Sequence, residues 1–233
     1  MDARRRRLCD VPTVDAGVTR AMPARRSASI ASIPVAISAR HVHLTQPTVE
    51  RLFGAGHQLR EHAPLTQPGQ FAAVEKVTLA GPHGRIAEVR VVGPTRSENQ
   101  VEVSRTDELR LGVDAPVRLS GQLSRTPGIT LIGPAGSVHL DRGVITASRH
   151  IHMTPADARR LGVHDREKVS VAIDSDGRDL IFGDVIVRVA PDFRLELHLD
   201  TDEGNAAGLH PGDTGQLLTP TALRARVHTP GRG

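Results

Sequence analysis

Two short His-x-His segments carry the residue types best suited to hold a metal ion. His41 and His43 form the first pair, and His150 and His152 form the second. Alternate side chains of an extended segment project from one face, so each pair can present two imidazoles to one ion. Neutral imidazole is a common protein ligand for zinc and similar divalent ions. Each pair is therefore a candidate metal site.

Either pair alone also has an ordinary interpretation, as strand histidines whose ring nitrogens bond to the backbone. Repetition favours the metal interpretation. An arginine, Arg40 or Arg149, precedes each pair, and a threonine, Thr45 or Thr154, follows two residues after each pair. The two segments form an internal repeat, and a repeated pair of ligands is harder to attribute to surface variation.

The segment 93–104 offers a carboxylate and an anion-binding side chain. Gln100, Glu102 and Ser104 would share one strand face, which makes Glu102 a candidate carboxylate ligand. Arg96 lies in the preceding turn, and its planar guanidinium suits a phosphate group. The sequence supports equally well an interpretation of Arg96 and Glu102 as ordinary surface charges.

A second candidate strand lies near residue 198. Glu196 and His198 alternate with leucines there, which predicts a half-buried strand with one polar face. His198 is the natural further metal ligand on that face. For Asp202 and Glu203 we favour capping of a helix that begins near Asn205 over a direct chemical role.

The elements that must position these residues are short. A β-branched apolar run, residues 33–38, precedes the first histidine pair, and Thr45, Pro47 and Gly54 are suited to cap, begin and end a helix after it. Other Val, Ile and Leu runs lie between turns, and aromatic residues make up only 2%. The pattern predicts a mostly β fold, with two β-barrel domains capped by short α-helices and related by the internal repeat.

Charge is concentrated at the start of the chain. Residues 1–26 hold seven arginines against three aspartates, which accounts for the whole net charge of +4. The rest of the chain has no basic excess and few aromatics for base stacking, so we expect no nucleic-acid partner. No apolar run approaches the roughly 20 residues of a membrane helix. With Cys9 as the single cysteine and no secretory pattern, a cytoplasmic location is expected.

Four segments of the chain form a pattern in fixed order. They are Ser-Ala-Arg-His-Val-His-Leu at 38–44, Gly-Pro-Thr-Arg-x-x-x-Gln-Val-Glu at 93–102, Ser-Arg-His-Ile-His-Met at 148–153 and His-Leu-Asp-Thr-Asp-Glu-Gly-Asn-Ala at 198–206. Together they resemble the PduL-type phosphate propanoyltransferase family, and the resemblance runs from about residue 33 to residue 218.

The resemblance implies a domain organisation in which the first strand completes the barrel of the C-terminal half. Residues 31–39 with 148–218 would form that barrel, and residues 40–147 the other. Residues 1–30 would be a disordered basic leader and a candidate targeting extension. Residues 219–233 would be a flexible tail.

The resemblance also implies a site with two divalent metal ions, usually zinc. One ion would be held by His41, His43 and Glu102, and the other by His150, His152 and His198. Arg96 would be the catalytic, phosphate-binding residue. The residues that contact coenzyme A stay unknown at this stage.

The implied reaction interconverts acyl-CoA plus phosphate with acyl phosphate plus coenzyme A. The acyl group would be propanoyl or acetyl, and phosphate would attack directly, without a covalent acyl-enzyme. The implied partners are these substrates, a second copy in a homodimer and microcompartment proteins. The implied location is the cytoplasm or the interior of a bacterial microcompartment.

Two alternatives belong to other classes. A metal-dependent thioesterase or other hydrolase could use the same ligands to activate water, but it would have no need of a phosphate-binding arginine. A non-catalytic microcompartment-associated protein could use the histidines as a structural metal site. Structural zinc sites are usually closed by four protein ligands, so three ligands per ion favour an enzyme.

Overall fold

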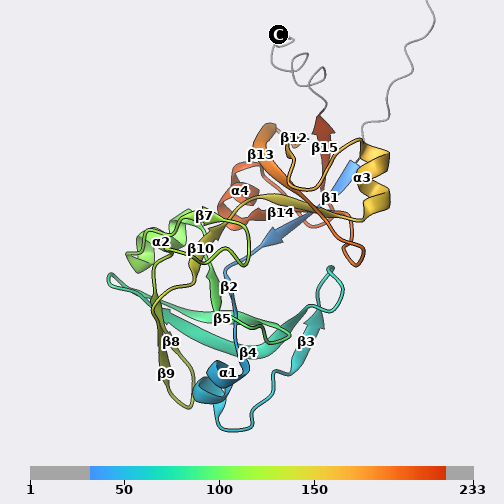
Figure 1. Cartoon of the computed structure of the whole chain (residues 1–233). Helices are drawn as coiled ribbons and strands as arrows, with labels where there is room; N and C mark the ends of the chain where they lie inside the picture. Colours follow the sequence, from blue (N-terminus) through green and yellow to red (C-terminus); the bar gives the residue numbers. More distant parts are fainter. Residues whose placement is uncertain (1–31, 219–233) are drawn as a thin grey trace, which may run out of the picture.

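The structure of the protein is a computed structural model that describes residues 32–218 (Figure 1). The predicted leader at residues 1–30, with Cys9, and the predicted tail at residues 219–233 lie outside the described residues. Within the described range, no helix is both long enough and apolar enough to cross a membrane.

One sheet is a closed barrel of six strands, at the top of Figure 1. Its strands are β1 (Ser32–Ser38), β11 (His150–Met153), β12 (Lys168–Ile173), β13 (Leu180–Val189), β14 (Glu196–Asp200) and β15 (Thr214–Leu218), and helices α3 (Pro155–Leu161) and α4 (Thr201–Ala206) flank them. The barrel is filled mainly by aliphatic side chains such as Ile33, Ile151 and Leu197, each 0% exposed.

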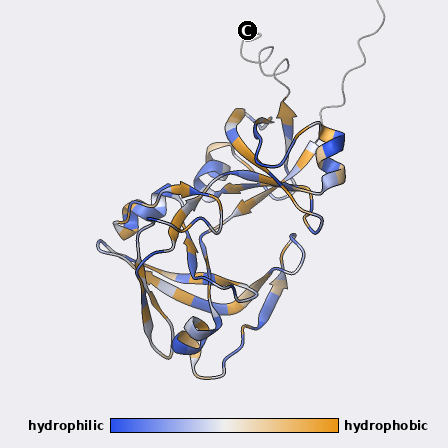
Figure 2. Ribbon diagram, viewed as in Figure 1, coloured by the Kyte–Doolittle hydropathy of each residue, from blue (hydrophilic) through white to orange (hydrophobic). Residues whose placement is uncertain are grey.

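The other sheet has nine strands and forms a half-barrel, at the bottom of Figure 1. Its strands are β2 (His41–His43), β3 (Glu61–Pro64), β4 (Phe71–Ala80), β5 (Arg85–Gly93), β6 (Gln100–Glu102), β7 (Val117–Arg118), β8 (Ile129–Ile132), β9 (Ser137–Leu140) and β10 (Val144–Ala147), with helices α1 (Gln46–Phe53) and α2 (Arg105–Leu111). Its strands alternate apolar and polar residues, so that orange and blue follow one another along the ribbons of Figure 2. The prediction of a mostly β fold with short helices is confirmed.

The chain crosses between the two sheets directly before each histidine pair. Strand β1 lies in the barrel, whereas β2 lies in the half-barrel, and β10 and β11 make the reverse crossing. The neighbours also correspond: β2 pairs antiparallel with β6 and parallel with β5, as β11 pairs with β14 and β13. The internal repeat therefore places His41 opposite Glu102 and His150 opposite His198.

Polar caps fix where the short helices begin. Thr45 is the N-cap of α1, with a proline in its first turn, and Gly54 ends it, as predicted. Thr154 caps α3 at the equivalent place in the repeat. The helix expected near Asn205 begins instead at Thr201, because Asp200 is its N-cap and pairs with Glu203 in a capping box.

The arginine before each histidine pair anchors its crossing segment. Arg40 Nε lies 2.8 Å from both carboxylate oxygens of Asp107, and Arg149 Nε lies 2.7 Å from Glu203 Oε1. Each acid sits at the third position of a helix capping box, in α2 and α4 respectively. The two arginines thus connect the crossing segments to α2 and α4, the helices that follow β6 and β14. This shared role explains why an arginine precedes both histidine pairs.

Replacing Arg40 with methionine is expected to lower the free energy of unfolding by about 1.5–3 kcal/mol, the usual contribution of a hydrogen bond to a charged group. The reason is that Asp107 is only 2% exposed and would lose its cationic partner. Urea unfolding measures the change, with Arg85→Met, at an exposed position, as the matched control. Equal stability of the two variants would show that the anchor contributes nothing.

Candidate active site

Both histidine pairs open onto one cleft of about 560 Å³ between the barrel and the half-barrel. The half-barrel contributes His41, His43, Arg96 and Glu102 to its lining, while the barrel contributes His150, His152, His198 and Arg188. The structure therefore brings together all seven residues that the sequence singled out, although they are up to 157 positions apart in the numbering.

In the first cluster, two imidazoles point their free nitrogens at one another. His41 Nδ1 lies 2.9 Å from the carbonyl oxygen of Ala39, and His43 Nδ1 lies 3.2 Å from that of Val92. A carbonyl only accepts hydrogen bonds, so both Nδ1 atoms carry the proton and both Nε2 atoms are left with lone pairs. These Nε2 atoms are 3.2 Å apart. Two facing lone pairs suit a shared cation.

Glu102 completes the first cluster. Its carboxylate oxygens lie 3.6 Å from His41 Nε2 and 3.9 Å from His43 Nε2. The side-chain amide of Gln100 donates to this carboxylate at 2.5 Å, while its oxygen accepts the backbone N–H of Gly121 at 2.7 Å. Burial, and then the charges of His41 and Arg96, lower the pKa of His43 to about 2, so its imidazole is neutral and free to ligate.

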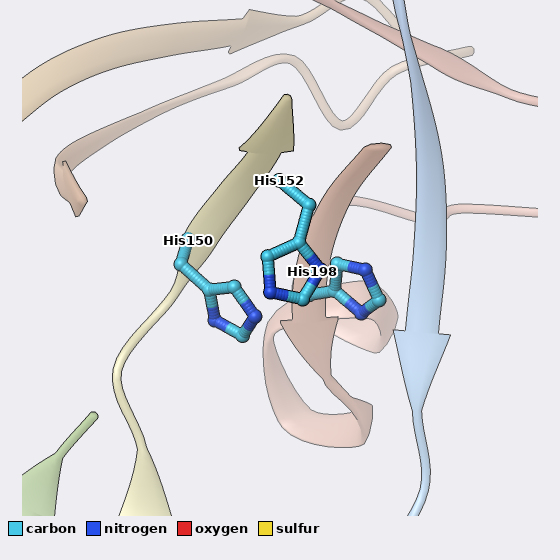
Figure 3. A group of neighbouring side chains, drawn as sticks. All are labelled: His150, His152 and His198. Atoms are coloured by element: carbon cyan, nitrogen blue, oxygen red, sulfur yellow. The ribbon is translucent and has the colours of Figure 1, made fainter. Parts of the chain in front are cut away.

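The second cluster consists of three stacked or edge-on imidazoles (Figure 3). The rings of His150 and His198 are parallel with centroids 4.9 Å apart, and the His152 ring lies 4.6 Å and 4.7 Å from them. Burial, followed by neighbouring histidines, lowers the pKa of His150 to about 4 and that of His152 to about 2. These two rings are therefore neutral at physiological pH.

His152 gives the clearest sign that the cluster takes a further group. Its side chain is buried, yet neither ring nitrogen has a hydrogen-bonding partner in the part of the chain that the structure describes. An unpaired buried polar atom is costly. The ligand atoms of each cluster lie within 4.8 Å of one another, which fits a divalent ion in both places.

Arg96 is held with its guanidinium in the cleft. Its backbone N–H donates to Leu44 at 2.8 Å, and its Nη1 donates to Ser120 Oγ at 3.1 Å. Ser120 Oγ also accepts from Gln100 at 2.8 Å, so one network orients both Arg96 and Glu102. Burial lowers the pKa of Arg96 and the Glu102 carboxylate opposes that shift, while the group stays cationic.

Among the cleft residues that were not predicted from the sequence as site residues, three carry a charged or amide side chain that matters for the site. Arg188 lies opposite His152 in the sheet, with its guanidinium 5.6 Å from the ring centroid of Phe193. Burial lowers its pKa, as it does for Arg96. A lone charged side chain ending the Val-Ile-Val run of β13 is a signal that could have revealed it. Gln67 and Glu196 are the others, and both are buried.

Comparison with known proteins identifies the family of the chain. The family model described as phosphate propanoyltransferase matches residues 34–210. A phosphate propanoyltransferase of Thermotoga maritima is 56% identical over 181 residues, covering 78% of this chain and 86% of that protein. One of Salmonella typhimurium is 54% identical over 189 residues, covering 81% and 90% respectively. The chain therefore belongs to the phosphate propanoyltransferase family and is an acyltransferase enzyme.

Proposed function

We propose that this enzyme converts acyl-CoA and phosphate to acyl phosphate and coenzyme A, and catalyses the reverse reaction, with a propanoyl or acetyl group. The observation that carries the proposal is the placement of the half-buried Arg96 guanidinium in one cleft with two clusters suited to metal ions. The names of the family and of its relatives support the same reaction.

Two divalent ions, for which zinc is the first candidate, would occupy the two clusters. When bound, they would supply Lewis-acid polarisation of the thioester carbonyl and positive charge for phosphate oxygens. The donor set fits this chemistry. Each cluster offers three protein ligands, so positions stay open for substrate, unlike in a structural zinc site.

Arg96 would bind and orient the phosphate. A guanidinium donates two parallel hydrogen bonds to one oxyanion, and Ser120 fixes the direction of this one. Arg188 adds a second half-buried cation to the same cleft. With phosphate held in this way, a phosphate oxygen attacks the carbonyl carbon, a C–O bond forms and the C–S bond breaks. Coenzyme A leaves as the thiolate and takes up the proton released by phosphate.

No covalent acyl-enzyme is needed in this scheme. Ser120 is occupied by Arg96 and Gln100, and Ser38 Oγ lies 3.5 Å from His198 Nδ1, too far for a strong hydrogen bond to a base. We therefore expect Ser38→Ala to retain acyl transfer within about tenfold, because loss of a true nucleophile costs about 10⁶-fold. Steady-state rates with propanoyl-CoA measure this, and a fall approaching the larger figure would point to an acyl-serine.

A metal-dependent hydrolase is the runner-up, because the same clusters could activate water. Release of free thiol from propanoyl- and acetyl-CoA, with and without phosphate, separates the two functions. The proposal predicts that thiol release requires phosphate. Equal release in phosphate-free buffer, with free acid as the product, would favour the hydrolase.

A further inference from the structure

We propose that Gln67 and Glu196 form a relay that orients His198 for the second metal ion. This inference rests on the proposed function in one respect, the binding of an ion by His150, His152 and His198. Glu196 and Gln67 would act as positioning residues, since they reach the ion only through His198.

The relay begins in the half-barrel. Gln67 lies between β3 and β4 and is only 4% exposed. Its side-chain oxygen accepts the backbone N–H of Arg194 at 3.2 Å, and its Nε2 donates to the carbonyl oxygen of the same residue at 3.2 Å. A donor and an acceptor on one residue leave the amide a single orientation. Its Nε2 also donates to Glu196 Oε2 at 3.1 Å.

Glu196 connects Gln67 to the metal ligand His198. The carboxylate is 5% exposed, and its Oε2 lies 3.0 Å from His198 Nε2. That separation satisfies the distance of a hydrogen bond, although the angle does not, and Nε2 has no better partner among the described residues. A rotation of the imidazole that improves this angle would let His198 donate to Oε2, the atom that also accepts from Gln67.

His198 needs such a partner because, unlike three of the other histidine ligands, it has no backbone carbonyl beside Nδ1 within residues 32–218. A backbone carbonyl lies beside Nδ1 of His41, His43 and His150, at 2.9 Å, 3.2 Å and 2.8 Å. The corresponding atom of His198 lies 3.5 Å from the hydroxyl of Ser38. A carboxylate on Nε2 would fix the tautomer of His198 instead and leave Nδ1 as the atom for the ion.

The internal repeat supports a positioning role for Glu196. Glu196 pairs with His152 in the barrel as Gln100 pairs with His43 in the half-barrel. Gln100 orients Glu102, its neighbour on the same strand face, and Glu196 stands in the same relation to His198. The two arrangements differ in one respect. Glu196 in the barrel is held by Gln67 of the half-barrel, which is 129 positions away in the sequence. Metal affinity of the barrel cluster thus depends on the half-barrel.

The test measures the affinity of the full-length chain for Co²⁺ and Zn²⁺ by chelator competition, together with the visible absorption of bound Co²⁺. Glu196→Gln and Gln67→Ala are compared with wild type, with His198→Ala as the loss of a ligand. Glu88→Gln, whose side chain is 76% exposed, is the matched control. We expect Glu196→Gln to lower the affinity for one of the two ions by about 10- to 100-fold and to shift the visible absorption bands of Co²⁺ bound at that site. The affinity for the other ion should not change. Gln67→Ala should lower the affinity for the same ion as Glu196→Gln by a smaller factor.

Two results would overturn the relay. Wild-type affinity for both ions in both variants would show that His198 needs no positioning. Loss of the ion by Glu196→Gln as complete as that by His198→Ala would make Glu196 a ligand. Absence of the metal site can be distinguished from absence of the relay, because the wild type would then bind no ion in the barrel. Should Gln67→Ala not fold, Glu196→Gln, which keeps size and polarity, carries the test alone.

Discussion

Replacing Arg96 with alanine is expected to reduce kcat/KM for phosphate by about 10²- to 10³-fold, the usual effect of removing one group that stabilises developing negative charge. The half-buried guanidinium lines the cleft and is held in one direction by Ser120, so its loss removes a positioned donor and a positive charge from the phosphate site. Coupled assays at varied phosphate concentration, with propanoyl-CoA saturating, measure the change.

Two further variants make the Arg96 result specific. Arg96→Lys keeps the positive charge but loses the planar fork, and we expect only partial recovery of kcat/KM for phosphate. Arg85→Ala removes an exposed arginine of β5 and should leave the rate unchanged. An Arg96→Ala enzyme with an unaltered KM and kcat for phosphate would exclude Arg96 from the phosphate site.

Loss of one ligand from either cluster is expected to remove one ion and to lower acyl transfer by about 10³-fold or more, since Lewis-acid stabilisation contributes several kcal/mol. His43 and His152 are the matched pair for this test, because they occupy equivalent, buried positions of the repeat. Metal analysis of His43→Ala and His152→Ala should find one ion per chain where wild type holds two.

The control for the ligand variants is His139→Ala. His139 is an exposed histidine of β9 that contacts Thr130 at 3.0 Å and does not line the cleft. It should keep both ions and the full rate. If His43→Ala and His152→Ala also kept both ions, the clusters would not be metal sites.

The local parts of the fold were predictable because short-range chemistry determines them. The His-x-His spacing, the threonine after each pair and the β-branched runs are contained within a few residues, and Thr45 and Thr154 do cap helices. One cap was misplaced. The sequence favours Asp202 and Glu203 as caps of a helix near Asn205, whereas Asp200 is the N-cap, so α4 begins earlier than predicted.

The parts that could not be predicted depend on contacts between distant segments. Whether Arg96 and Glu102 were surface charges or cleft residues was undecided from the sequence, because their surroundings come from Ser120, His41 and the facing barrel. Gln67 carries no pattern at all. Its place in the site depends on Arg194, 127 positions away, to which its side chain is hydrogen-bonded from the loop before β4.

The decisive measurement for metal-dependent acyl transfer to phosphate is the formation of acyl phosphate by metal-free protein. It is followed as Zn²⁺ is added back in the presence of propanoyl-CoA and phosphate. One titration shows both whether phosphate is the acyl acceptor and whether the reaction needs metal ions in the two clusters. We expect no acyl phosphate without metal and a rate that saturates near two ions per chain, with thiol and acyl phosphate formed in equal amounts. Acyl phosphate formed at the full rate by the metal-free protein, or thiol released without acyl phosphate, would contradict metal-dependent transfer to phosphate.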